Sequence, residues 1–207
     1  LATYALSWAC ALAGPEAPAG GGHAESEPVW SILRRPEVAA LLGACLLMSF
    51  AHGPLYAFYS IYLVEHGYSK SSVGWLWAVG VICEIGVFIW MPHVLRRFSL
   101  LRVLQFSFAM GALRFLIIGW GVEWFGLVLF AQTLHAFSFG AYHAAAVALI
   151  HHYFRGKHQA RGQAIYASVS FGAGGTLGSL YSGYAWESLG PQLTFTIAAG
   201  FAFFAAL

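Results

Sequence analysis

Long stretches without a charged side chain constrain this chain more than any other feature. The ranges 38–64, 124–154, 162–186 and 188–207 contain no Asp, Glu, Lys or Arg. The ranges 73–95 and 103–122 each contain one such residue, Glu84 and Arg114. Each range reaches the length of roughly 20 apolar residues that a helix needs to cross a bilayer. We therefore predict an all-α integral membrane protein with six spans.

The overall composition supports a bilayer as the environment of the chain. Hydrophobic residues make up 59% and charged residues 9%, whereas a soluble domain carries about 25% charged residues. The net charge of +2 comes from scattered basic residues, so we expect lipid and not nucleic acid as the surrounding partner. The cysteines show no metal-ligand spacing, and we expect no metal and no cofactor.

The chain divides into three parts. Residues 1–13 resemble the end of a truncated transmembrane helix. Residues 14–35 are rich in Gly, Pro, Ala and Glu, which is typical of a flexible solvated linker. Pro36 and Glu37 then predict a helix start. Residues 36–207 are expected to form a six-helix bundle that is cut off in its last helix.

The basic residues indicate an orientation in the membrane. One set of alternating loops contains almost all of them: Arg34, Arg35, Arg96, Arg97, Arg102, Arg155, Lys157 and Arg161. The opposite loops contain only Lys70, together with Glu65, Glu123 and Glu187. Because Lys and Arg favour cytoplasmic loops, the linker 14–35 and the basic loops are predicted to lie in the cytoplasm.

Two charged residues lie near the middle of predicted spans, Glu84 and Arg114. A charge at that depth costs roughly 2.5–3.5 kcal/mol on insertion scales, so it normally has a partner, a polar cavity or a ligand. The two residues lie on adjacent antiparallel spans at similar depth and are able to pair. They form either a structural ion pair or part of a transport site.

Three histidines are candidate site residues within the spans. His52 precedes Gly53-Pro54, where the helix is expected to bend, and bent helices in transporters expose backbone groups to a cavity. His135 and His143 are separated by about 80° and about 12 Å on one helix, so both can face one cavity. The alternatives are histidines packed between helices and, more remotely, a haem held by His52 and His135.

Aromatic and small residues complete the pattern. Tyr56 and Tyr59 share a helix face and are expected either to line a cavity with His52 or to pack against lipid and other helices. Gly174 and Gly178 form a GxxxG motif, and Gly175, Ser179 and Gly183 form a second small-residue row. Both patterns predict close helix packing.

A set of motifs resembles the 3-phenylpropionate transporter family of the major facilitator superfamily. The resemblance rests on residues 49–63 (SFAHGPLYAFYSIYL), 67–69 (GYS), 73–77 (VGWLW), 80–84 (GVICE), 96–99 (RRFS), Arg114, 132–136 (QTLHA), His143 and 163–166 (QAIY). It covers the chain from about Pro36 to its end. It corresponds to the C-terminal half of that family, with helices seven to twelve and the end of helix six.

The resemblance implies a two-half transporter in which alternating access exposes a central cavity. It also implies proton symport, because the family is similar to the lactose permease, whose sugar and proton site contains an acid, an Arg and a His at places comparable to Glu84, Arg114 and His135. That permease has a second carboxylate where this chain has Ser138. A missing N-terminal half, a monomeric state and the inner (plasma) membrane of a bacterial cell are further implications.

We therefore expect a secondary transporter, not an enzyme, that couples protons to a small organic solute such as 3-phenylpropionate. Glu84 would exchange the proton, with Arg114 and His135 tuning it. Arg114 could alternatively bind the carboxylate of the solute. His52, Tyr56 and Tyr59 would shape the pocket, and His143 would complete the site. The alternatives are a sugar or nucleoside symporter of the same fold and, more remotely, an intramembrane enzyme or haem protein.

Overall fold

The computed structural model describes residues 28–207, and this part of the chain contains helices and no strands. The predicted segment 1–13 and most of the predicted linker lie outside the described residues. The helices are α2 Val29–Leu33, α3 Pro36–Ala51, α4 Gly53–Glu65, α5 Lys70–Arg97, α6 Leu100–Gly121, α7 Phe125–Thr133, η1 Ala136–Ala141, α8 Tyr142–Tyr153, η2 Gly156–His158, α9 Gln159–Ala167, η3 Ser168–Gly174, α10 Gly175–Leu189 and α11 Pro191–Ala205.

The predicted all-α membrane fold is confirmed. Within residues 28–207, four helices are long and apolar enough to cross a bilayer, namely Pro36–Glu65, Lys70–Arg97, Leu100–Gly121 and Phe125–Tyr153. The other two predicted spans are also helical. The first, formed by α9, η3 and α10, is richer in Gly and hydroxyl residues, and the second, α11, has 15 residues. The span of α9, η3 and α10 is less apolar than the other four, and α11 is shorter than they are.

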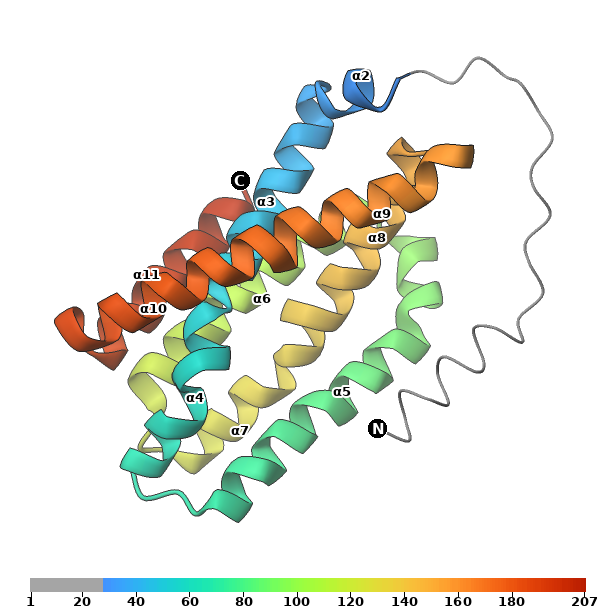
Figure 1. Ribbon diagram of the computed structural model, residues 1–207. Coiled ribbons are helices and arrows are strands. Elements are labelled where there is room, and N and C mark those ends of the chain that lie inside the picture. The colour runs from blue at the N-terminus through green and yellow to red at the C-terminus, as the bar shows by residue number, and fades with distance from the viewer. Residues whose placement is uncertain (1–27) are drawn as a thin grey trace, which may run out of the picture.

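The helices pack as an antiparallel bundle (Figure 1). Helix α11 lies against α6 and α3, α10 lies against α4, and η3 lies against α3. Helix α5 contacts η1 and α7, and it leaves much of its apolar surface exposed. Large exposed apolar side chains are expected where a helix faces lipid rather than water.

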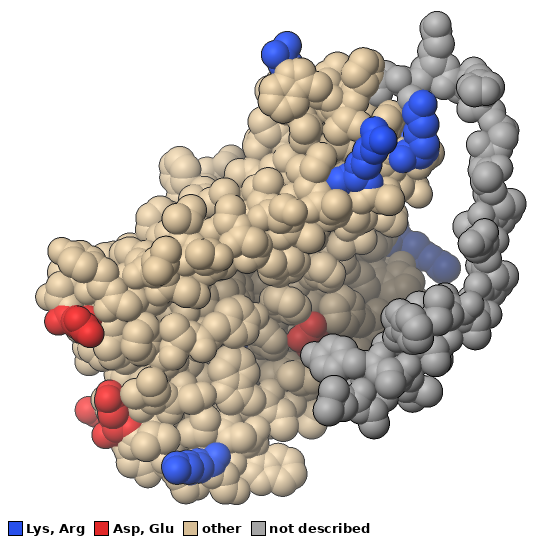
Figure 2. Space-filling view, viewed as in Figure 1, with Lys and Arg blue, Asp and Glu red and all other residues tan. Residues whose placement is uncertain are grey.

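Charged side chains separate to the two ends of the bundle. Figure 2 shows Lys and Arg side chains mainly at the end where α2 and the start of α9 lie. Glu side chains lie mainly at the opposite end of the visible face. This arrangement follows from the alternation of the helices, because α5 ends at Arg97, close to the start of α6, and α8 ends shortly before Arg155.

Three of the long helices are irregular at the depth of the candidate residues. Helix α3 ends at Ala51 and α4 begins at Gly53, so the chain turns at His52 as the Pro54 motif predicts. The segments η1 and η3 are π-helices, which occur frequently at functional sites. No pattern in the sequence predicted these π-helices.

The GxxxG motif lies where helices approach most closely. A side chain at Gly174 would meet the backbone of Leu46, and one at Gly178 would meet the backbone of Phe50. The prediction of close packing is therefore confirmed for this motif. The second small-residue row packs differently, because Gly175 and Gly183 have open space around them.

Candidate functional site

The Arg114 side chain is the centre of a buried polar cluster. It lies on α6 and has no exposed surface. Its Nη1 group donates to His135 Nδ1 at 3.0 Å and to Ser138 Oγ at 3.4 Å, and its Nη2 group donates to Gln132 Oε1 at 3.1 Å. The three acceptors follow one another at three-residue spacing along α7 and η1, which places them on one side of the helix.

The hydrogen bonds determine the tautomer of His135. A guanidinium only donates hydrogen bonds, so His135 Nδ1 accepts and carries no proton. The ring proton of the neutral imidazole therefore lies on Nε2, which is 3.2 Å from Glu84 Oε2. His135 thus links the guanidinium of Arg114 to the carboxyl group of Glu84. The expected direct pair between Glu84 and Arg114 is replaced by this bridge.

Glycines allow α5 to approach the cluster. A Cβ atom on Gly140 of η1 would lie 3.0 Å from Glu84 Cγ, and one on Gly80 would lie 3.2 Å from Gln132 Oε1. A larger residue at either position would push α5 away or displace a polar side chain. Glu84 itself is only partly buried, so the carboxyl group lies at the accessible end of the chain of hydrogen bonds.

Several buried polar atoms near Arg114 have no hydrogen-bond partner among the described residues. They are Arg114 Nε, Tyr59 Oη, Gln132 Nε2 and His52 Nε2. Buried polar groups are nearly always hydrogen-bonded in folded proteins. A group of unpaired ones therefore indicates a candidate functional site.

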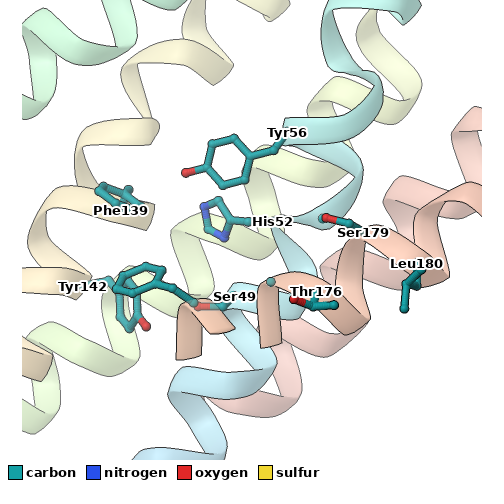
Figure 3. A pocket seen from close by; sticks show the side chains of 11 residues that line it. Ser49, His52, Tyr56, Phe139, Tyr142, Thr176, Ser179 and Leu180 are labelled. Atoms are coloured by element: carbon teal, nitrogen blue, oxygen red, sulfur yellow. The ribbon is translucent and has the colours of Figure 1, made fainter. Parts of the chain in front are cut away.

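A cavity of about 450 Å³ opens beside this cluster. Its walls come from α3, α4, η1, α8, η3 and α10 (Figure 3). The lining residues are Ser49, His52, Gly53, Tyr56, Phe139, Tyr142, Phe171, Gly175, Thr176, Ser179 and Leu180. The lining is therefore aromatic on one side, with hydroxyl groups on α3 and α10.

Two ring side chains, His52 and Phe139, line the part of the cavity nearest the polar cluster. His52 stacks on Tyr56 with ring centroids 5.8 Å apart, and its Nδ1 atom donates to Met48 O at 2.8 Å. Phe139 stacks on His135 at 5.4 Å. His52 and Phe139 both line the cavity, and the stacking of Phe139 on His135 brings the cavity wall into contact with the polar cluster.

Of the predicted site residues, His52 and Tyr56 line the cavity, and Glu84, Arg114 and His135 form the polar cluster beside it. Tyr59 and His143 do not line the cavity either. Tyr59 is fully buried, whereas Tyr56 lines the cavity, so the two tyrosines do not share the lining. His143 stacks on the far side of Phe139 at 6.0 Å, and its Nδ1 atom lies 3.1 Å from Tyr166 Oη. Its partner is therefore on α9, and His135 and His143 do not face one cavity.

Gln132 and Ser138 take part in the cluster, although sequence reasoning gave them no role. The sequence does contain a pattern that could have predicted this, because Gln132 and Ser138 lie three residues before and after His135 in an apolar span. The pocket residues Phe171, Thr176 and Ser179 were also missed as site residues. The packing of η3 against α3 places Phe171 in the lining, and the packing of α10 against α4 places Thr176 and Ser179 there.

The geometry offers little to a metal or haem. Within residues 28–207, no three His, Cys, Asp or Glu side chains gather at one point. Both ring nitrogens of His135 are engaged, with Arg114 and Glu84. His52 has one unengaged nitrogen, so the pair of histidines does not supply two axial ligands.

Comparison with known proteins identifies the family. The model of the MFS_1 like family matches residues 3–197. The chain is 31% identical over 186 residues to the probable 3-phenylpropionic acid transporter of Escherichia coli (strain K12), covering 87% of this chain and 48% of that protein. The chain thus spans about half the length of this relative. No solved structure gives a significant match. The family match and the helical membrane fold together show that the chain belongs to the MFS_1 like family of the major facilitator superfamily.

Proposed function

We propose that this chain is part of a proton-coupled symporter for a small aromatic carboxylate such as 3-phenylpropionate. The chain of hydrogen bonds from Arg114 through His135 to Glu84 carries the proposal. It places a carboxyl group that can bind a proton next to a fixed cation in the apolar interior. The family and the name of the E. coli relative, a probable 3-phenylpropionic acid transporter, point to a transporter and not to an enzyme.

The charge balance of the cluster would couple proton binding to the binding of a substrate anion. With Glu84 ionised and His135 neutral, the negative charge of Glu84 balances the positive charge of Arg114. Protonation of Glu84 leaves the cluster with one positive charge, which is costly in an apolar interior unless an anion accompanies it. A substrate carboxylate restores neutrality. Proton and substrate therefore bind together and leave together.

The cavity suits the aromatic part of such a substrate. Tyr56, Phe139 and Phe171 provide flat apolar surfaces, and Ser49, Thr176 and Ser179 provide hydroxyl groups at the opposite side. Aromatic rings pack well against such surfaces. Arg114 holds the substrate anion through its field and not by direct contact, because its guanidinium is fully buried and does not line the cavity.

The length of the E. coli relative indicates what would surround the cavity. This chain spans about half of that protein, so an N-terminal half would supply the second wall of the cavity. The protein would work as a monomer in the bacterial inner membrane. The basic end of the bundle would face the cytoplasm, because Lys and Arg favour that side.

Uptake by membrane vesicles tests this function. Vesicles containing the full-length protein receive an inward proton gradient, and labelled 3-phenylpropionate is followed for the wild type, Glu84→Gln and the loop control Glu65→Gln. We expect gradient-driven uptake in the wild type and in Glu65→Gln, and loss of the gradient effect in Glu84→Gln. Unchanged gradient-driven uptake in Glu84→Gln would remove Glu84 as the coupling residue. Uptake of a sugar or nucleoside in place of 3-phenylpropionate would overturn the substrate class.

A further inference from the structure

A second, larger hollow lies away from the candidate transport site. It has a volume of about 860 Å³ and lies between α5, α6 and η1. Its lining residues are Cys83, Gly86, Val87, Trp90, Met91, Val94, Phe98, Arg102, Val103, Phe106, Thr133, Ala136, Phe137 and Ala141. None of the candidate transport residues is among them, so this groove is a separate feature.

The groove is apolar except at one end. The Thr133 hydroxyl donates to Phe130 O at 2.7 Å, so it offers no proton to a ligand. Trp90 is 69% exposed and Phe106 is 50% exposed, although both line the groove. The charged group in the lining is Arg102, in the first turn of α6. A ligand that fits must be long and apolar with one polar end.

The polar end has a pronounced positive charge. Arg96 and Arg97 lie in the last turn of α5 and Arg102 lies just across the connection to α6. All three are exposed, and Arg102 forms no ion pair with any residue that the structure describes. A cation in the first turn of a helix is also disfavoured by the helix dipole. An anionic group bound here would offset both effects.

The length of the groove matches one leaflet of a bilayer. From Cys83 to Phe98 the lining follows α5 for about 22 Å at 1.5 Å per residue. A bilayer with its headgroups is roughly 40–45 Å thick, so one leaflet is about half of that. We propose that this groove binds an anionic phospholipid, with an acyl chain along α5 and the phosphate at Arg102. Basic pockets between transmembrane helices are suited to such headgroups.

Photo-crosslinking tests this lipid site in the intact protein. The protein is reconstituted in nanodiscs of phosphatidylglycerol or phosphatidylcholine that carry a photoreactive acyl chain, and the labelled peptides are mapped after irradiation. We expect labelling within 83–106 that is stronger with phosphatidylglycerol. Arg102→Gln should lower the phosphatidylglycerol yield roughly five-fold, as the loss of one basic contact with an anionic lipid predicts. Lys157→Gln, at another loop of the same end, should leave it unchanged.

A second pair of variants separates the groove from general lipid contact. Gly86 lines the groove and Gly74 lies elsewhere on α5, and a Cβ atom added at either position would meet no atom within 4 Å. Gly86→Trp should abolish labelling by both lipids, whereas Gly74→Trp should preserve it. Labelling that survives Gly86→Trp would overturn the proposal, and so would equal labelling by the two lipids. An unlabelled groove in the wild type, covered by another part of the protein, would overturn it as well.

Discussion

The polar cluster around Arg114 and the apolar groove between α5 and α6 are built partly from the same segment, η1. Ser138 of η1 bonds to Arg114 in the interior, while Phe137 and Ala141 line the groove. Arg114 has no exposed surface, whereas Ile89 on α5 is 74% exposed. A soluble protein has the opposite arrangement. The difference shows that polar side chains in this bundle point inward, because lipid solvates apolar groups and cannot pair with a charge.

Loss of the central cation should cause the largest effect. Arg114→Ala leaves Gln132, His135 and Ser138 without their shared partner in the interior, and leaves the charge of Glu84 unbalanced. Removing one member of a buried charged network typically costs about 3–5 kcal/mol. We expect a large drop in the thermal unfolding temperature in detergent. Lys157→Ala in the α8–α9 loop is the control and should change little. Similar unfolding temperatures for the two variants would show that the cluster does not stabilise the fold.

The amide of Gln132 should contribute less. Gln132→Leu keeps the size of the side chain and removes the acceptor of Arg114 Nη2, so one buried donor loses its partner. The expected cost in unfolding free energy is about 1–3 kcal/mol. Gln105 on α6 is exposed, and Gln105→Leu should cost less than about 0.5 kcal/mol. Denaturant unfolding of both variants measures the difference, and a larger loss for Gln105→Leu would contradict the account.

Two glycine-to-alanine substitutions, one facing the Glu84 side of α5 and one facing the groove side, should have the smallest effects on stability. Gly140→Ala would bring a Cβ atom to 3.0 Å from Glu84 Cγ, and we expect a loss of about 1 kcal/mol from this overpacking. Gly86→Ala points into the open groove and should stabilise α5 by up to about 1 kcal/mol through helix propensity. Opposite signs of the two changes in unfolding temperature would confirm the contrast. Equal changes would contradict it.

Apolar run length and isolated charges were enough to predict much of the fold and the principal polar residues. The helices of spans one to four and the turn at His52 follow from patterns local to each span. The grouping of Arg114 with His135 was implied by the family resemblance and not by those local patterns. The bridge through His135 does not follow, because it depends on the distance between α5 and η1 that Gly80 and Gly140 permit. Sequence periodicity gives the face of a helix and not the neighbour that covers it.

The pocket illustrates the same limit. Tyr56 and Tyr59 share a helix face, yet the packing of α4 places one in the cavity and the other in the interior. Thr176 and Ser179 line the cavity because Gly174 and Gly178 let α10 approach α3 and α4 closely. The π-helical segments η1 and η3 also change the register of the residues that follow them. These effects arise from packing between distant parts of the sequence.

Proton movement during substrate entry is the most direct test of the coupling role of Glu84. Proteoliposomes containing the full-length protein and a lumenal pH dye receive 3-phenylpropionate, and the rate of lumenal acidification is compared with that of protein-free liposomes, which report passive entry of the protonated acid. The account predicts faster acidification with the wild type and with Glu123→Gln, and only the passive rate with Glu84→Gln. Protein-dependent substrate entry without acidification, or acidification that persists in Glu84→Gln, would contradict it.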